Sequence, residues 1–294
     1  MTDREPRPEP LVEDAAATRR EMREKWGARA AGWNQRRRES DGLLNELSEH
    51  LIELGEIAPG QRVLDVACGG GDPAFAIGEV IGPSGSVIAV DITEQMILAA
   101  QEFAQQHSVD NVDFRLIESE LEINLPPASV DVVTCRCGLM LMPDPVAAAA
   151  AWRTFLKPGG RIVVSTWGPP EYCDFFTLLP RIAAKHLGRH RSPRPTSQFR
   201  LSTPEILSQT LERAGYRDID ARYYDQVMQT FPSAEAWWEE TSWRGQGANL
   251  LKGLPPTALQ AIQDDAIEFL NAEFADGPVE ITNRVNLATA KNPG

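Results

Sequence analysis

The 294-residue chain carries 42 acidic and 29 basic side chains, and 42% of its residues are hydrophobic. The formal net charge of −13 repels polyanions, which disfavours non-specific binding to nucleic acid or to anionic membranes. Its apolar runs are shorter than the roughly 18 residues that cross a bilayer, and no basic-then-apolar signal sequence stands at its N-terminus. We therefore expect a globular, cytoplasmic protein without a membrane span, whose four cysteines stay reduced.

The first 58 residues divide into a tail and a helical segment. Residues 1–14 are rich in proline and charge, so we expect a disordered tail. In residues 15–58, apolar side chains recur at helical spacing around Trp26 and again around Leu47. This pattern predicts two helices before the first strand. Trp33 is a candidate pocket residue, and packing between a helix and the core is an equal alternative.

Residues 62–91 predict a strand, a glycine turn, a helix and a second strand. The apolar run 63–67 is typical of a strand covered on both faces, and the glycines 69–71 that follow let a ligand lie against bare backbone. Pro73 suits the first turn of a helix, whose free N–H groups would face that ligand. Asp91, at the tip of the second strand, can accept hydrogen bonds from ribose hydroxyls. The stretch predicts a nucleoside-binding βαβ unit.

Strands and helices alternate from residue 59 to residue 168, which predicts a parallel sheet with helices on both faces. Right-handed crossovers place the loops that follow the strands along one edge, where ligands bind. The predicted strands are 62–67, 86–91, 112–117, 130–135 and 160–167, and the predicted helices are 73–81, 93–107 and 145–156. The predicted fold class is α/β, with a Rossmann-like doubly wound, mainly parallel sheet.

Four motifs resemble those of class I S-adenosylmethionine-dependent methyltransferases, particularly the ubiquinone/menaquinone-biosynthesis type. In chain order they are VLDVACGGGD, VIAVDITEQMI, SVDVVTCRCGLMLMPDP and FLKPGGRIVVSTW. The resemblance covers about residues 20–230 and the last strand, VEITNRVNLATAKN. It implies S-adenosylmethionine as methyl donor, S-adenosylhomocysteine as its product, and N-terminal helices that cover the active site.

The same resemblance assigns roles to residues of the first two motifs. Asp91 would bind the ribose of the cofactor. The residues implied at its aminoacyl half are Asp65, Ala67, Cys68, Gly69 and Gly71.

At the adenine, the resemblance implies packing by Ile92 and Met96, for which ordinary core packing is the alternative. The family usually places an acid before the fourth strand that contacts the adenine amino group. Here Ser119 stands at that position, flanked by Glu118 and Glu120. Just after the fourth strand, Arg136 and Cys137 would border the methyl-transfer cavity. Arg136 is assigned to the cofactor and Cys137 to the substrate.

The character of the chain changes after residue 168. Glu171 follows the fifth strand in a loop that should face the cofactor cleft, which makes it the candidate general base; a solvated surface carboxylate is the alternative. Residues 171–203 then lack acids beyond residue 174 but contain six arginines and lysines. We interpret them as a basic lid for an anionic acceptor, with His190 and Arg200 as substrate-binding residues. A solvated or ion-paired basic face is the alternative.

The rest of the chain predicts a helix over 204–214 and a strand over 219–231, which completes a core spanning residues 59–231. Residues 232–277 are rich in tryptophan and in helical apolar spacing, so we expect a helical cap insertion in which Trp237 walls an apolar pocket. A plain packing or dimer surface is the alternative. Residues 278–294 supply the last core strand and a tail.

These features lead us to expect a methyltransferase for a small apolar, in one version anionic, acceptor. C-methylation of a prenyl diphosphate, an isoprenyl diphosphate or a quinone-like compound is favoured. O- or N-methylation in secondary metabolism is the alternative, as is a cofactor-binding protein without transfer. Magnesium would suit a diphosphate, but no motif indicates a metal site. The expected partners are the small-molecule acceptor and, as an option, a second copy of the chain, with no nucleic acid.

Overall fold

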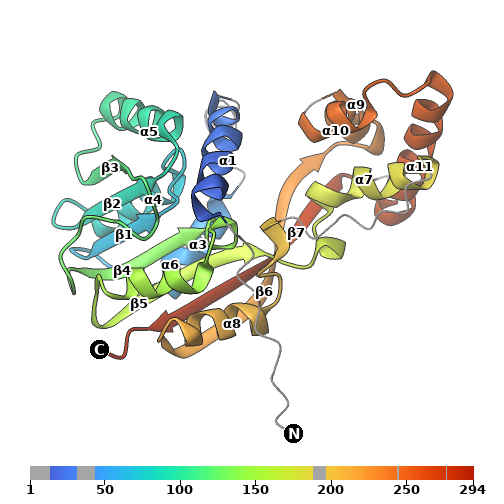
Figure 1. Cartoon of the computed structure of the whole chain (residues 1–294). Helices are drawn as coiled ribbons and strands as arrows, with labels where there is room; N and C mark the ends of the chain where they lie inside the picture. The colour runs from blue at the N-terminus through green and yellow to red at the C-terminus, as the bar shows by residue number, and fades with distance from the viewer. Residues whose placement is uncertain (1–13, 32–43, 188–196, 244, 276) are drawn as a thin grey trace, which may run out of the picture. The chain divides into compact units, whose positions relative to one another are not determined.

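The computed structural model of the chain describes residues 14–31, 44–187, 197–243, 245–275 and 277–294 (Figure 1). The chain divides into two compact units. The first unit runs to residue 166 and also includes residues 203–222 and 286–294, whereas the second consists of residues 167–202 and 223–285.

A seven-stranded sheet has the order β3-β2-β1-β4-β5-β7-β6. The β1–β2, β1–β4, β2–β3 and β4–β5 pairs are all parallel. The predicted α/β class with a doubly wound, mainly parallel sheet is thereby confirmed. The strands are β1 (Arg62–Val66), β2 (Ser86–Asp91), β3 (Val112–Leu116), β4 (Val130–Arg136), β5 (Leu156–Trp167), β6 (Arg217–Phe231) and β7 (Val279–Lys291).

The three central strands of the first unit are buried because both of their faces are apolar. Val63, Leu64 and Val66 of β1 are at most 1% exposed. Two polar exceptions on these strands lie in register with each other, since Asp65 of β1 pairs with Thr134 of β4. The strand order reverses between β1 and β4, and ligands of such sheets bind outside the carboxyl ends of the strands at that point.

The helices of the first unit are positioned by caps that the sequence supplies. The Asp144 side chain accepts a hydrogen bond from the Ala147 backbone N–H (3.0 Å), and Thr203 caps its helix in the same way at Ile206 (3.3 Å). Three helices also begin with a proline in the first turn. The helices are α1 (Ala15–Gly27), α3 (Asn45–Leu54), α4 (Asp72–Ile81), α5 (Glu94–Gln106), α6 (Pro145–Arg153) and α8 (Pro204–Arg213), with a short 3₁₀ turn η1 (Leu139–Leu141).

Strand β7 neighbours β5 in an antiparallel register. The backbone of Gly160 accepts from Asn292 (2.8 Å), and farther along β7 the Gly168 N–H donates to Arg284 (2.7 Å). Residue numbers rise along one strand while they fall along the other, which is the antiparallel pattern. Strand β7, the last strand in the chain, therefore runs opposite to the direction that β1 to β5 share.

The second unit is mainly helical and has its own apolar core. This core gathers Leu178 and Ile182 with the aromatic side chains Trp237 and Trp238 and with Leu270. The two tryptophans are only 3% and 7% exposed, so most of their surface packs against neighbouring apolar side chains. The elements of the unit are η2 (Pro170–Tyr172), α7 (Asp174–His186), η3 (Ser197–Phe199), α9 (Ala234–Trp243), α10 (Gly245–Leu251) and α11 (Pro256–Phe274).

Helix α7 occupies part of the segment that the sequence suggested as a basic lid. This helix was not predicted from the sequence, because a proline inside a helix is unfavourable and Pro180 lies within it. The apolar spacing of Leu178, Leu179 and Ile182 is nevertheless helical, and all three side chains are buried. On the same helix, Arg181 pairs with Asp174 (3.1 Å) and His186 with Asp265 (2.9 Å). Both of these side chains are therefore in contact with acids of the same unit.

Within the ranges set out above, no helix combines the length and the apolar character needed to cross a bilayer.

The Tyr216 hydroxyl provides a test of the packing of helices on the sheet. Tyr216 is fully buried, and its Oη donates to the Ala149 carbonyl of α6 (3.0 Å). Tyr216→Phe should lower the free energy of unfolding by about 1 kcal/mol, because the buried carbonyl loses its donor. Urea denaturation of both proteins measures this. Tyr172→Phe, at a side chain that is 52% exposed, is the matched control; equal stabilities of the parent and Tyr216→Phe would contradict the role of the hydrogen bond.

Candidate functional site

The glycine turn after β1 lies at the switch point of the sheet. Gly69 and Gly71 have positive φ angles of 55° and 96°, a region that favours glycine. A Cβ atom on Gly71 would meet Phe75 and Phe114 at 2.7 and 2.9 Å, so close packing also requires glycine there. A Cβ atom on Gly69 would meet nothing within 4 Å. The backbone over Gly69 is thus open to a ligand.

The Asp91 carboxylate joins the end of β2 to this turn. Its Oδ2 accepts from the Gly69 N–H (3.0 Å) and its Oδ1 from the Thr93 N–H (2.8 Å). Burial raises the pKa of Asp91, and the two backbone donors oppose that shift. Each carboxylate oxygen can accept more than one hydrogen bond, so Asp91 keeps capacity for the hydroxyls of a ligand.

Asp65 is fully buried one strand away. Its Oδ1 accepts a hydrogen bond from the Thr134 hydroxyl at 2.7 Å, whereas its Oδ2 is buried and has no hydrogen-bond partner among the described residues. Desolvation raises the pKa of Asp65 to about 7, although the Thr134 hydrogen bond and the charge of Arg136 oppose the shift. An unsatisfied buried oxygen beneath a glycine turn is an acceptor for which a ligand or a water can supply the donor.

The Arg136 guanidinium, at the end of β4, is held by protein groups. Its Nη1 donates to the Leu44 carbonyl (3.0 Å) and to Ser48 Oγ (2.7 Å), and its Nη2 lies 3.4 Å from Asp72. These contacts join the start of α3 to the start of α4, directly after the glycine turn. Arg136 therefore links α3 to α4 at the point where α4 follows the glycine turn.

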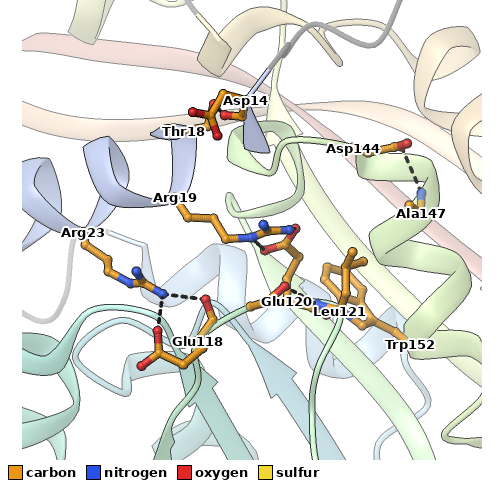
Figure 2. Close-up of polar contacts among 11 residues, drawn as sticks. Asp14, Thr18, Arg19, Arg23, Glu118, Glu120, Leu121, Asp144, Ala147 and Trp152 are labelled. Atoms are coloured by element: carbon orange, nitrogen blue, oxygen red, sulfur yellow. Dashed lines mark hydrogen bonds and ion pairs between the residues drawn. The ribbon is translucent and has the colours of Figure 1, made fainter. Parts of the chain in front are cut away.

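The side chains predicted at the adenine lie at the ends of β2 and β3. Met96 is 2% exposed on α5, and Ile92 is half-buried just before that helix. Ser119 is buried after β3, and its Oγ accepts from the Leu121 N–H (3.2 Å). The acids on either side of Ser119 form ion pairs with arginines of α1: Glu118 with Arg23 and Glu120 with Arg19 (Figure 2).

The segment after β4 is apolar apart from its first residue. Cys137 has a positive φ of 54°, and its N–H donates to Ser165 Oγ (3.0 Å). Burial raises the pKa of the Cys137 thiol to about 11, so it stays protonated at neutral pH. The next residues, 138–142, are Gly-Leu-Met-Leu-Met. These five residues include no carboxylate or imidazole, and Leu139 and Met140 are fully buried.

The first unit brings together the cofactor candidates of the first two motifs. Ala67, which has a positive φ of 57°, and Cys68, whose thiol pKa burial raises, both lie in the turn that follows β1. Burial here also explains why Cys68 packs as a small apolar side chain. The pairing of Asp65 with Thr134 is a tertiary contact that the spacing of the motifs did not indicate.

Three of the remaining candidates belong to the second unit. Glu171 is exposed in η2, Arg200 is half-buried, and Trp237 belongs to the core of the second unit. Trp33 and His190 lie outside the described residues. All five assignments stay predictions.

Sequence reasoning missed four residues that contact the candidate residues or their immediate neighbours: Asp72, Thr134, Arg19 and Arg23. The positions of Arg19 and Arg23, four residues apart on one helix, were a signal, but their partners lie about 100 residues away in sequence. In the part of the chain that the structure describes, no three or more His, Cys, Asp or Glu side chains are grouped as a metal site requires.

Residues 57–215 match the model of the family described as a methyltransferase domain, and the chain belongs to this family. It is 28% identical over 264 residues to nocamycin O-methyltransferase of Saccharothrix syringae, an alignment that covers 83% of this chain and 90% of that protein. The ubiquinone/menaquinone biosynthesis C-methyltransferase UbiE of Ralstonia pickettii is 33% identical over 190 residues, with 62% and 77% covered. The crystal structure of YcgJ from Bacillus subtilis has the same fold, with a TM-score of 0.53, 19% identity, and 83% and 97% covered.

The protein is therefore an S-adenosylmethionine-dependent methyltransferase of the class I fold, as the four motifs predicted. The residues present suit this cofactor. The open backbone over Gly69 can accommodate it, and the orphaned Oδ2 of Asp65 can accept from a positively charged donor. The sulfonium of the cofactor supplies an activated methyl group, so the protein has to align donor and acceptor.

Asp65 makes a testable contribution to the pH dependence of stability. Its folded-state pKa of about 7 exceeds the ordinary aspartate pKa of 3.8, so between about pH 4 and pH 7 the folded protein holds a proton that the unfolded chain has lost. Stability from this group therefore falls as the pH rises, by about 2–3 kcal/mol between pH 5 and pH 8. Asp65→Asn should remove that fall, which urea denaturation at the two pH values measures. Parallel pH profiles for the parent and the variant would refute the assignment.

Proposed function

We propose that S-adenosylmethionine binds along the edge formed by the glycine turn, Asp91 and the loop after β3. In this arrangement Asp65, Ala67, Cys68, Gly69 and Gly71 hold the aminoacyl half. Asp91 binds the ribose with the oxygen lone pairs that its two backbone donors leave available. Ile92, Met96 and Ser119 surround the adenine. Arg136 supports the turn indirectly, by holding Asp72 of α4 and Ser48 of α3, because its guanidinium is already bound to these two side chains.

The ribose assignment has a direct test. Asp91→Ala should weaken the binding of S-adenosylhomocysteine about tenfold or more, because a buried charged acceptor is lost. Isothermal titration calorimetry measures the affinity. Asp91→Asn, which keeps the size of the side chain and one acceptor oxygen, should bind with intermediate affinity. Unchanged affinity in Asp91→Ala, with a melting temperature equal to that of the parent, would contradict the assignment.

For the acceptor, the observation with the most weight is the composition of the loop after β4. Its thiol has a pKa of about 11 and its other side chains are apolar, so it supplies no base near neutral pH. An acceptor that is already ionised needs none. The proposal is therefore O-methylation of a small, largely apolar metabolite through an acidic hydroxyl or a carboxylate. The similarity to nocamycin O-methyltransferase, which extends over most of both chains, supports this choice.

C-methylation of a quinone-like or prenyl acceptor is the second candidate. It is favoured by the 33% identity to the C-methyltransferase UbiE. Methyl transfer to carbon leaves a proton to be removed, and Glu171 would be the base that removes it. Glu171 is exposed in η2, so its carboxylate is in contact with solvent. Its position therefore does not provide the burial that would adapt a carboxylate to act as a general base.

The two candidates make opposite predictions for one experiment. The protein is incubated with methyl-labelled cofactor and a panel of phenols, enolisable diketones, aromatic carboxylic acids and quinols, and the methylated atom is located by NMR. We expect an O-methyl product, whose kcat/KM rises with pH through the pKa of the acceptor itself, and a kcat for Glu171→Gln within about twofold of the parent. A C-methyl product together with a large fall in kcat for Glu171→Gln would establish the second candidate. Cofactor binding without transfer to any member of the panel would favour a binding protein.

A further inference from the structure

Helix α1 attaches to the first unit through both apolar and polar contacts. Within Ala15–Gly27, Met22 is buried, Trp26 is half-buried, and six side chains carry charge. The burial of one methionine side chain stabilises a contact by only about 2 kcal/mol. We therefore expect the polar contacts of α1 to add substantially to its attachment.

Two ion pairs provide those contacts (Figure 2). Arg19 donates from Nε and Nη2 to the two oxygens of Glu120, at 2.8 and 2.7 Å. The side chains of this pair are only 15% and 5% exposed. One turn farther along α1, Arg23 donates to the carboxylate of Glu118 (2.9 Å) and to the carbonyl of the same residue. The Arg19 pair is bidentate and shielded from solvent, which makes it the stronger of the two.

The segment that α1 binds is the loop after β3. At its start, the Ile117 N–H donates to the Asp91 carbonyl (3.0 Å), which ties the loop to the end of β2. At its far end, the Glu120 carbonyl accepts from the indole Nε1 of Trp152 (2.9 Å), a fully buried side chain of α6. Glu120 is thus held through its backbone by α6 and through its side chain by α1. Ser119 lies between these anchors.

Both acids beside Ser119 contact α1, but to different extents. The Glu120 side chain is only 5% exposed and meets Arg19 through both oxygens, so little of it is accessible to another molecule. Glu118 contacts Arg23 through one carboxylate oxygen, and its side chain is 84% exposed. The adenine assignment therefore stays with Ser119, which lies between them.

We infer that the Arg19–Glu120 ion pair fastens α1 onto the loop that carries Ser119 and thereby positions the adenine side of the cofactor site. Arg19 and Glu120 are positioning residues, because they act through the loop and through α1 rather than on the reacting atoms. The inference rests on the adenine assignment of the preceding subsection.

A double-mutant cycle on cofactor binding tests it. Arg19→Gln and Glu120→Gln should each weaken the binding of S-adenosylhomocysteine about tenfold, and the double variant should lose no more than either single one, because all three lack the same contact. Arg19→Glu, which places two carboxylates together, should lose more than Arg19→Gln. With labelled cofactor, the KM for S-adenosylmethionine should rise while kcat at saturation stays within about twofold of the parent.

Arg20→Gln is the matched control, because it removes the same charge from the same helix at an exposed position. It should bind S-adenosylhomocysteine as the parent does. Affinities within twofold of the parent for both single variants, or strictly additive losses in the double variant, would overturn the inference. Equal losses in Arg20→Gln and Arg19→Gln would also overturn it, since helix charge alone would then be responsible.

The inference and the cofactor assignment can fail separately. If the parent binds S-adenosylhomocysteine and Asp91→Ala does not, the cofactor site stands whatever the Arg19 variants show. Melting temperatures of the unliganded variants identify any loss of affinity that results from unfolding. A fall in kcat equal to the rise in KM would indicate a general structural defect and would contradict a positioning role confined to cofactor binding.

Discussion

The hydrogen bond from the Gly69 N–H to the Asp91 carboxylate connects the two strands on which the whole site depends. It requires parallel β1 and β2 to end at the same edge of the sheet, and it requires a backbone at residue 69 that adopts a positive φ. Both conditions keep the turn open above Gly69 while Asp91 remains buried. The cost of burying the carboxylate, visible as its raised pKa, is offset by two backbone N–H donors.

Asp65 is also a buried carboxylate at this edge of the sheet, but unlike Asp91 it has a hydrogen-bond donor among the described residues for only one of its two oxygens. The register of β1 with β4 places it beside Thr134, but one of its two oxygens stays unsatisfied, and its pKa rises to about 7. A protein retains such a group at a cost in stability, which is typical of functional sites. Arg136, Asp72 and Ser48 then hold the adjoining elements in place, so that the turn between these carboxylates is fixed from several directions.

The loop after β3 is joined to α1 by charge. Glu118 and Glu120, on either side of Ser119, pair with Arg23 and Arg19 of that helix. These contacts connect two segments that lie about 100 residues apart in the sequence. The same unit contains a loop after β4 whose residues 138–142 are Gly-Leu-Met-Leu-Met.

Local sequence was sufficient for the α/β class and for a nucleoside-binding turn, because buried parallel strands are apolar along their whole length and because glycine at a positive φ has few substitutes. The identity of the cofactor followed from the resemblance of the four motifs to a known family. The strands and most helices of residues 62–167 could therefore be predicted to within a few residues. Helix α7 could not, since Pro180 interrupts its pattern, and the core position of Trp237 could not, since apolar spacing does not distinguish packing from a pocket. By itself the sequence determined the strand–turn–strand unit and its nucleoside ligand. Only the tertiary structure decided which charges meet, such as Arg19 with Glu120 and Asp65 with Thr134, because those partners lie 101 and 69 residues apart and no local preference joins them.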